Sequence, residues 1–337
     1  MDTNLLVIGL GSMGKRRVRN LIALGFKNIY GFDLRDDRRN EAQILYNINV
    51  VETFEEAKNK GCKAWIISTS PDTHHIYMKE AVDSKVPAFI EASVVDTDFE
   101  MLIADSLKNN VLLAPSSTLF FHPAIKLINQ IIKSNQIGNV TNILYHSGQY
   151  LPDWHTYEKV EDFYVSKQET GGAREIVPFE LTWLTKIFGF PNRVCGFYKK
   201  TINIPGAEKI EDTYNILLEY DKSILNLSVD VVSRHATRKL LVNGELGQIQ
   251  WDWDEKVVKL YNADKGTWIK LDYDTSPAQQ GYNKNITEQM YIDEINCFLN
   301  AAFNNDVFEN SLVEDYKVLK LLYAAEISAQ TNQIQKN

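Results

Sequence analysis

The chain of 337 residues has few cysteines and no long apolar run. Its three cysteines, Cys62, Cys195 and Cys297, lie far apart, so they lack zinc-ligand spacing and cannot all pair within one chain. We expect free, buried thiols in a reducing compartment. No apolar run reaches the roughly 20 residues that a transmembrane helix needs. A strand pattern begins close to Met1, where a cleavable leader would show a basic and then an apolar segment. We therefore expect a cytoplasmic protein with no membrane partner.

Positive charge is also scarce. Lysine and arginine number 36 against 44 aspartates and glutamates, which gives a net charge of −8. A non-specific nucleic-acid binder needs a basic face, so we expect no nucleic-acid partner, although a phosphorylated small molecule remains open. No cluster of side chains has metal-ligand spacing, since the adjacent His74 and His75 cannot easily present both rings to one ion. We predict no metal site.

What the chain does contain is a glycine motif near its start. The stretch "NLLVIGLGSMGKRRVRNLIALG" is an apolar run, then G-x-G-x-x-G, then a helical pattern. This strand-turn-helix context is the one that a dinucleotide-binding turn requires. The first glycine permits the tight turn, the second lets a pyrophosphate approach the backbone, and the third lets the helix pack on the strand. The candidate phosphate-binding residues are Gly9, Gly11, Ser12, Met13 and Gly14.

A carboxylate follows at the distance that the motif predicts. The next apparent strand, "NIYGFD", ends at Asp33, which is 19 residues after Gly14. An aspartate there is placed to bind a ribose diol and would repel a 2′-phosphate, so we predict NAD as the cofactor. Arg35 and Arg39 keep NADP open. The alternative is the same strand and turn with no cofactor.

Residues 1–118 continue as alternating strands and helices, which predicts an α/β Rossmann domain with a doubly wound parallel sheet. Ligands of such sheets lie at the carboxyl ends of the strands. Ser68, Thr69 and Glu91 all stand at such ends.

Residues 119–337 have a different pattern. Runs of about six to ten alternating residues, separated by turn signals such as Asn243-Gly244, predict a large, mostly antiparallel sheet within an α+β domain. The final stretch, 312–330, has helical spacing. We assign to this domain substrate binding and oligomerisation, and we expect a homo-oligomer formed through the open face of the sheet.

The order of several segments resembles the Gfo/Idh/MocA family of NAD(P)-dependent sugar oxidoreductases. These segments are "GLGSMG", "IISTSPDTHHIY", "VPAFIEAS", "FFHPAI" and "GGAREIVPFELTWL". The resemblance implies that Glu91 contacts the nicotinamide ribose. It also implies that four residues line the nicotinamide side of the cofactor: Ser68, Thr69, Pro71 and His74.

Two departures from the family pattern bear on the chemistry. The resemblance implies a lysine after Glu91 that polarises or protonates the substrate oxygen, but this chain has Ala92 there. It also implies an aspartate and a histidine after the double glycine, and those positions fall near Ile176 and Phe179. The usual acid/base pair is therefore missing.

The segment from Gly148 to Glu180 is rich in polar and aromatic residues, and a long loop between a strand and a helix is often functional. For the substrate we single out Asp153, Trp154, Tyr157 and Arg174, because tryptophan stacks on a sugar ring, aspartate accepts hydroxyl hydrogens and arginine binds anions. For acid/base catalysis we single out Glu180, His155 and Glu175. For each of these residues the alternative is a purely structural role, in a surface loop or in a helix.

We therefore predict an NAD(P)-dependent oxidoreductase that acts by hydride transfer on a sugar, sugar nucleotide or sugar acid, with non-standard acid/base residues. Two alternatives remain. One is a non-redox protein that binds nucleotide or sugar. The other is NAD-assisted elimination or glycoside hydrolysis, in which the hydride leaves and returns.

Overall fold

The computed structural model describes residues 2–154, 159–274, 287–304 and 306–336. The chain divides into two compact units, Met1–Thr118 with Gln289–Tyr316, and Leu119–Glu288 with Lys317–Asn337.

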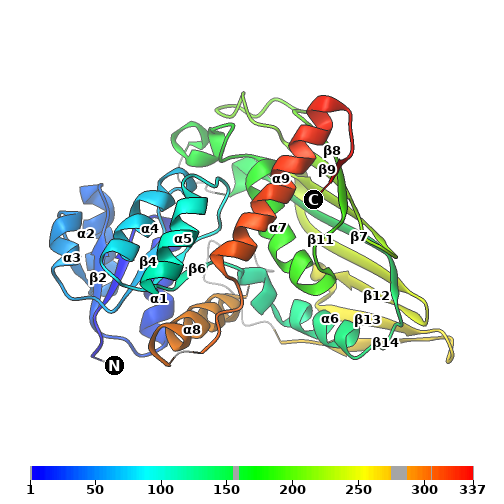
Figure 1. The fold of residues 1–337 in the computed structure, drawn as a ribbon, viewed down its shortest axis with the longest axis horizontal. Coiled ribbons are helices and arrows are strands. Elements are labelled where there is room, and N and C mark those ends of the chain that lie inside the picture. Colours follow the sequence, from blue (N-terminus) through cyan, green and yellow to red (C-terminus); the bar gives the residue numbers. More distant parts are fainter. Residues whose placement is uncertain (1, 155–158, 275–286, 305, 337) are drawn as a thin grey trace. The chain divides into compact units, whose positions relative to one another are not determined.

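The first unit is built on a six-stranded parallel sheet with the strand order β3-β2-β1-β4-β5-β6 (Figure 1). The strands are β1 (Leu5–Ile8), β2 (Ile29–Phe32), β3 (Asn49–Val51), β4 (Ala64–Ile67), β5 (Ala88–Ile90) and β6 (Leu113–Pro115). Every residue of β1, β4 and β5 is buried, as expected of parallel strands covered on both faces. The order reverses between β1 and β4, so the predicted ligand crevice lies at their carboxyl ends.

Helices connect these strands. They are α1 (Ser12–Ala23), α2 (Asp36–Tyr46), α3 (Phe54–Lys58), α4 (His74–Asp83) and α5 (Phe99–Asn109), with a 3₁₀ turn, η1 (Pro71–Thr73), before α4. Along α1 the buried positions include Val18 and Leu21, whereas Ile22 is 43% exposed.

Helix α8 (Glu288–Asn304) comes from the far end of the sequence but belongs to the first unit. Its Ile295, Phe298 and Leu299 are buried in the same core cluster as Phe89 of β5, and the ring centroids of Phe89 and Phe298 are 5.8 Å apart. The expected division assigned all of 119–337 to the second domain. The structure differs because the apolar face of α8 completes the core of the first unit.

The second unit is built on a nine-stranded sheet with the order β14-β13-β12-β11-β7-β10-β9-β8-β15. The strands are β7 (Val140–Tyr150), β8 (Arg193–Lys199), β9 (Thr213–Glu219), β10 (Ile224–Asp230), β11 (Val232–Gly244), β12 (Gly247–Asp252), β13 (Val257–Asn262), β14 (Thr267–Asp272) and β15 (Gln335–Lys336). The pair β7–β10 is parallel and the other recorded pairs are antiparallel. The two predicted fold classes, a parallel Rossmann sheet followed by a mostly antiparallel one, are thus confirmed.

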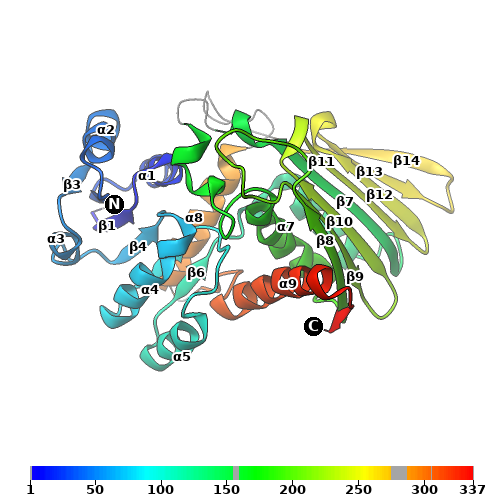
Figure 2. The same cartoon turned by 90° about the horizontal axis from the view of Figure 1, so that it is seen from above.

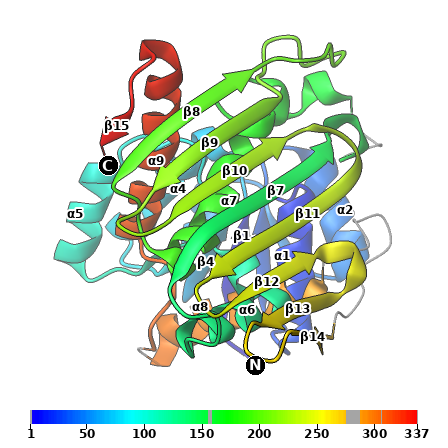
Figure 3. The same ribbon diagram turned by 90° about the vertical axis from the view of Figure 1, so that its right-hand side faces the viewer.

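The helices of this unit lie on one face of the sheet (Figure 2). They are α6 (Pro123–Lys133), α7 (Ala173–Phe188) and α9 (Leu312–Thr331), and α9 begins in the first unit. The chain also forms short 3₁₀ turns, which are η2 (Thr118–Phe121), η3 (Leu151–Asp153), η4 (Val160–Asp162), η5 (Tyr164–Ser166) and η6 (Trp253–Glu255). The other face of the sheet has no helix of the described residues over it (Figure 3). Burial alternates along β9 and β10, with apolar residues toward the helices.

Candidate active site

The turn between β1 and α1 has the geometry of a dinucleotide-binding turn. Gly9 has φ +88°, and a Cβ placed on it would lie 2.6 Å from the carbonyl oxygen of Ser68. A Cβ on Gly14 would lie 1.8 Å from the carbonyl oxygen of Gly9, so helix and strand are too close for any side chain. At Gly11 the nearest atom to an added Cβ is Nη1 of Arg38, at 3.4 Å. The backbone of Gly11 is therefore accessible to a ligand.

The first turn of α1 suits an anion. Ser12 and Met13 begin the helix, and its N-cap, Gly11, has no side chain to bind the first amides. The first turn contains no acidic residue. The amides and the positive end of the helix dipole can therefore bind phosphate. These residues fit a pyrophosphate.

Asp33 lies at the end of β2, next to the glycine turn. Its Oδ2 accepts a 2.7 Å hydrogen bond from the amide of Leu10, and its Oδ1 accepts a 2.9 Å bond from the amide of Arg35. The residue is buried. A carboxylate fixed in this place fits the ribose diol of a dinucleotide.

Three arginines follow Asp33, and they differ in position. The Arg35 guanidinium pairs with Asp37, and both side chains are more than half exposed. Arg39 donates to the carbonyl oxygen of Asp33 at 2.6 Å. Arg38, which the sequence analysis did not single out, has Nη1 3.9 Å from Asp33 Oδ2. Arg38 is thus the arginine whose guanidinium adjoins the glycine turn.

The loop after β4 is held by buried polar groups. Nε2 of His74 donates to the carbonyl oxygen of Thr69 at 3.0 Å, since a carbonyl can only accept. Burial lowers the pKa of His74 to about 4, so the ring is neutral near pH 7. Pro71 begins the 3₁₀ turn, and the Ser68 hydroxyl donates to Glu91 Oε1 at 3.3 Å. His74 therefore fixes the shape of the loop, and cofactor contacts by these residues remain predictions.

Glu91, at the end of β5, is held by an arginine. Nε of Arg17 donates to Oε1 at 2.6 Å, and Nη2 donates to Oε2 at 3.0 Å. The same Nη2 donates to Oε2 of Glu294 at 2.8 Å. The implied contact of Glu91 with the nicotinamide ribose remains a prediction. The structure also shows that Glu91 belongs to a buried ion-pair network with Arg17 and Glu294, which was not predicted from the sequence.

A signal for this network was present in the sequence. Arg17 lies on the buried side of α1 with Leu21, and Glu294 lies on α8 between the buried Tyr291 and Ile295. Charged residues are seldom fully buried unless they are paired. A charge of each sign on the apolar side of two helices therefore indicates a buried pair.

In the second unit, the double glycine shapes the start of α7. A Cβ on Gly171 would lie 1.8 Å from the carbonyl oxygen of Val165. Gly172 has φ +61°, and its Cβ would lie 2.5 Å from the carbonyl oxygen of Glu211. The glycines therefore allow the chain after η5 to fold closely on itself before the helix begins.

Glu175, in the first turn of α7, is a carboxylate with one bound oxygen. Its Oε1 accepts a 2.5 Å hydrogen bond from the Tyr164 hydroxyl. Its Oε2 is buried and has no hydrogen-bond partner among the described residues. Burial raises the pKa of Glu175 to about 7. A group that titrates near neutral pH can both accept and donate a proton.

Glu180, one turn further along α7, is fully buried and bound on both oxygens. Its four donors are Tyr145 Oη at 2.7 Å, Ser147 Oγ at 2.8 Å, Trp183 Nε1 at 2.8 Å and Arg238 Nε at 2.9 Å. This corrects the expectation that Glu180 is available to a substrate proton, because donors of β7, β11 and its own helix occupy its oxygens. The side chain instead joins α7 to the sheet.

The remaining predicted substrate residues are spread over two places. Asp153 is exposed and Trp154 is half-buried, both just after β7. Arg174, beside Glu175 on α7, donates from Nε to Glu326 Oε1 at 2.7 Å, so its charge is already paired. His155 and Tyr157 lie outside the described residues.

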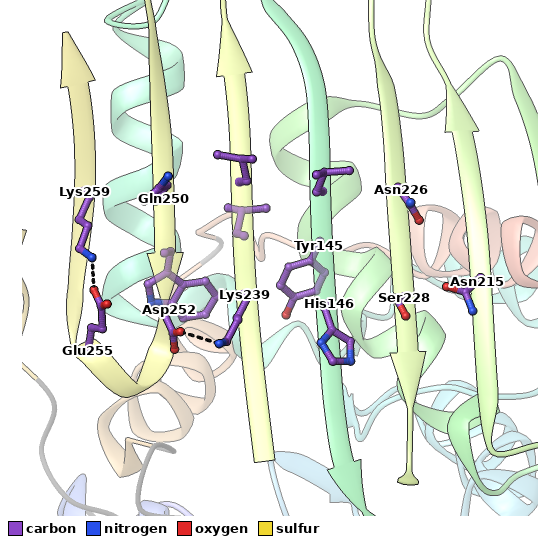
Figure 4. A pocket seen from close by; sticks show the side chains of 14 residues that line it. Tyr145, His146, Asn215, Asn226, Ser228, Lys239, Gln250, Asp252, Glu255 and Lys259 are labelled. Atoms are coloured by element: carbon purple, nitrogen blue, oxygen red, sulfur yellow. Dashed lines mark ion pairs between the residues drawn. The ribbon is translucent and has the colours of Figure 1, made fainter. Parts of the chain in front are cut away.

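The open face of the nine-stranded sheet has a hollow of about 490 Å³ that was not among the predicted sites (Figure 4). Two ion pairs line it, with 3.0 Å between Lys239 and Asp252 and 2.5 Å between Lys259 and Glu255. Its other lining residues include Leu144, His146, Asn215, Asn226, Ser228 and Gln250. The hollow combines amide, charged and aliphatic groups.

Among the described residues, no group of three or more histidine, cysteine, aspartate or glutamate side chains is arranged to hold a metal ion. Within the same part of the chain, no helix has both the length and the apolar character needed to cross a bilayer.

Comparison with known proteins places the fold. Residues 125–250 match the family model of the GFO/IDH/MocA C-terminal domain, and no curated protein sequence matches the chain. An oxidoreductase from Agrobacterium radiobacter, solved with NAD+, L-tartaric acid and magnesium, has a TM-score of 0.87 and 13% identity, covering 100% of this chain and 98% of that one. A putative NADPH-dependent oxidoreductase from Desulfitobacterium hafniense has a TM-score of 0.84 and 14% identity, with coverage of 100% and 98%.

Levoglucosan dehydrogenase, solved with NADH and levoglucosan, has a TM-score of 0.85 and 14% identity, covering 100% of this chain and 99% of that one. These identities are low, so the solved structures establish a shared fold. Together with the family model they confirm the predicted resemblance: residues 125–250 match the GFO/IDH/MocA C-terminal domain, and the whole chain shares its fold with solved oxidoreductases.

Proposed function

We propose that this protein is an NAD-dependent oxidoreductase that transfers a hydride between the cofactor and a sugar, sugar nucleotide or sugar acid. The observation that carries the proposal is the glycine turn. Gly9 and Gly14 leave no room for side chains, and the backbone of Gly11 is open beside the first turn of α1. Support also comes from proteins of the same fold that were solved with NAD+ or NADH, one of them with levoglucosan.

We propose NAD as the preferred cofactor. The buried Asp33 carboxylate suits a ribose diol and would repel a 2′-phosphate. Arg38 lies beside this carboxylate and offers a positive charge, which keeps NADP open. We therefore expect tighter binding of NAD than of NADP, with Asp33 and Arg38 setting the difference in affinity.

The proton of the substrate hydroxyl needs a carrier, since Ala92 stands where the family lysine is expected. Bound NAD supplies the acceptor or donor of the hydride. We assign the proton to Glu175, whose Oε2 is the unbound oxygen and whose pKa is about 7. The Tyr164 hydroxyl fixes Oε1. His155 remains a further candidate, and Glu180 has the weaker claim because its oxygens are bound.

For the substrate we retain the four predicted residues as proposals. Trp154 can stack on the apolar face of a sugar ring, and Asp153 can accept hydroxyl hydrogens beside it. Tyr157 belongs to the same segment. Arg174 can reach an anionic substituent only by sharing its guanidinium with Glu326.

A single substitution tests the cofactor. Gly11→Val places a side chain where the nearest atom to the new Cβ is a flexible arginine tip, so the fold should be retained. The same side chain blocks the approach of a pyrophosphate. We expect calorimetry to show NAD binding by the wild type, loss of binding by Gly11→Val, and an unchanged melting temperature. Equal NAD affinity in the two proteins would remove the cofactor proposal.

Ligand binding without redox chemistry is the second candidate function. It is favoured by Ala92, Ile176 and Phe179, which stand where the family resemblance implies acid/base residues. Incubation of the protein with NAD+ and a panel of sugars distinguishes the candidate functions. NADH formation supports the dehydrogenase, turnover without net NADH supports NAD-assisted elimination or hydrolysis, and binding without turnover supports the second candidate.

We also propose that the open face of the sheet joins two copies of the chain. Leu144, Leu217 and Ile224 expose between two-fifths and about half of their surface on β7, β9 and β10. Exposed apolar residues on adjacent strands favour an interface. Light scattering should show an oligomer that Leu217→Lys dissociates, with Leu107→Lys, on a helix of the first unit, as the control.

A further inference from the structure

A buried cluster of charges lies at the carboxyl ends of β5 and β6 in the first unit. Arg17 and Glu294 have no exposed side-chain surface, whereas the Glu91 side chain is 12% exposed. Of these three residues, Glu91 is thus the one that a ligand at the strand ends can touch. Arg17 and Glu294 can act on a ligand only through it.

Glu294 is the anchor of the cluster. Its Oε1 accepts hydrogen bonds from Ser116 Oγ at 3.0 Å and from the amide of Ser117 at 2.6 Å. Its Oε2 accepts from Thr118 Oγ1 at 2.7 Å and from Arg17 Nη2 at 2.8 Å. The segment that follows β6 therefore fixes Glu294, and Glu294 fixes one end of the Arg17 guanidinium.

Arg17 transmits this constraint to Glu91. Its guanidinium carbon lies 4.5 Å from the centroid of the Phe89 ring and 5.3 Å from that of Tyr291. Its Nε and Nη2 bind the two oxygens of Glu91 in the side-by-side manner that orients a carboxylate. The positive charge beside Glu91 thus comes from Arg17 of α1. It does not come from the residue that follows Glu91 in the sequence, which is the uncharged Ala92.

We infer that Arg17 and Glu294 are positioning residues, which hold Glu91 in the orientation that binds the nicotinamide half of the cofactor. The inference rests on the proposed NAD function. Glu91 stands at a strand end, where dinucleotides bind in such sheets, and its orientation is set by a fully buried fork.

A purely structural role makes a different prediction. Arg17 belongs to α1, whose first turn would hold the phosphates, so a displaced helix would weaken binding of every ligand that contacts them. A positioning role affects only ligands that carry the nicotinamide ribose. ADP has the adenosine and the phosphates but lacks that ribose, so it separates the two roles.

The experiment measures NAD+ and ADP affinity by calorimetry for the wild type, Arg17→Met, Glu91→Gln, Glu294→Gln and the double variant Arg17→Met/Glu91→Gln. Loss of a hydrogen bond to a charged group corresponds to roughly tenfold or more in affinity, so we expect about a tenfold loss of NAD+ affinity in the first two single variants. ADP affinity should stay at the wild-type value. The double variant should bind NAD+ no more weakly than Glu91→Gln, because the two residues act as one unit. Glu294→Gln should show a smaller loss in the same direction.

Asp212→Asn provides the matched control. Asp212 is a fully buried carboxylate of the second unit that accepts hydrogen bonds from the amides of Thr201 and Ile202. It should lower the melting temperature without changing NAD+ affinity, which separates stability from binding. Should Arg17→Met fail to fold, Arg17→Lys carries the test, because a lysine keeps the charge but cannot form the fork.

Equal losses of NAD+ and ADP affinity in the Arg17 variant would overturn the inference in favour of a structural role. Additive losses in the double variant would overturn it as well. Wild-type affinity for NAD+ in both Arg17 variants would refute it while leaving the proposed function intact. A wild-type protein that binds no NAD+ would refute the proposed function and the inference together.

Discussion

The first and second turns of α7 each carry a glutamate, and the two side chains have opposite surroundings. Glu180 receives four hydrogen bonds, one of them from the guanidinium of Arg238. Glu175 receives one, from a neutral tyrosine, and one of its oxygens is buried without a partner among the described residues. Burial alone therefore does not make a carboxylate reactive. The presence or absence of a compensating cation decides whether it stabilises the fold or can move a proton.

Glu91 follows the pattern of Glu180. It too is paired with a buried arginine, although it keeps a small exposed surface. Each unit thus has a buried carboxylate paired with an arginine, whereas Glu175 of the second unit has no ion pair with a cation among the described residues.

Removal of the cation should convert Glu180 into an uncompensated buried charge. Breaking a buried ion pair from one side costs about 3–5 kcal/mol, so we expect Arg238→Met to lower the free energy of unfolding by about that amount. Denaturant titration measures it. Arg193→Met is the matched control, since its pair with Glu219 is about half exposed and should contribute much less to stability. Equal effects of the two variants would contradict the contrast.

Removal of the uncompensated carboxylate should affect the rate instead. We expect Glu175→Gln to lower kcat by roughly 10²-fold or more, the scale of general acid–base catalysis, with NAD affinity unchanged. Steady-state kinetics on a substrate found in the sugar panel measures it. Glu161→Gln, in the exposed 3₁₀ turn η4 before α7, should turn over normally. Normal turnover by Glu175→Gln would move the proton carrier to His155.

The rate should also depend on pH in a defined direction. A base that accepts the hydroxyl proton must be ionised, so the oxidation rate should rise with pH through about 7, the pKa of Glu175. The Tyr164 hydrogen bond lowers that pKa, so Tyr164→Phe should move the inflection to higher pH. A pH–rate profile of both proteins tests this. An inflection that stays in place would show that another group titrates.

The smallest effect concerns stability. Burial raises the pKa of Glu175 from its ordinary value of 4.5 to about 7, so the folded state loses stability as pH rises from about 4.5 to about 7, and the loss is complete above that. Glu175→Gln removes this penalty and should raise the melting temperature by a few degrees at pH 8, with little change at pH 4.5 or below. Thermal unfolding at the two pH values is the measurement. A melting temperature that falls at pH 8 would mean that the ionised side chain has a partner.

The sequence allowed prediction of those features that depend on neighbouring residues. The glycine turn, Asp33 and the alternation of strands and helices are local patterns, and each fold class followed from them. The turn at Gly171 and Gly172 was equally local, although its close contact with Glu211 was not.

Features that join distant segments could not be predicted in the same way. Arg17 and Glu294 are separated by 277 positions, so the helical pattern can mark each as a buried charge but cannot show that they pair with each other. The hydrogen bonds of Glu180 could not be foreseen, because three of its donors lie on β7 and β11. One of them, Arg238, lies 58 residues further along the chain. Helix α8 was not singled out at all, and its place in the first unit depends on an apolar face that only the folded core explains.

The position of α8 also has a consequence for the order in which the protein is made. A ribosome completes the strands of the first unit by residue 118, but Ile295, Phe298 and Glu294 are translated only after most of the second unit. Until then the nascent sheet lacks part of its core, and Arg17 lacks one of its two carboxylates. Amino-terminal domains usually fold first during synthesis. In this chain the first unit to be translated cannot complete its core until the residues of α8 have been made.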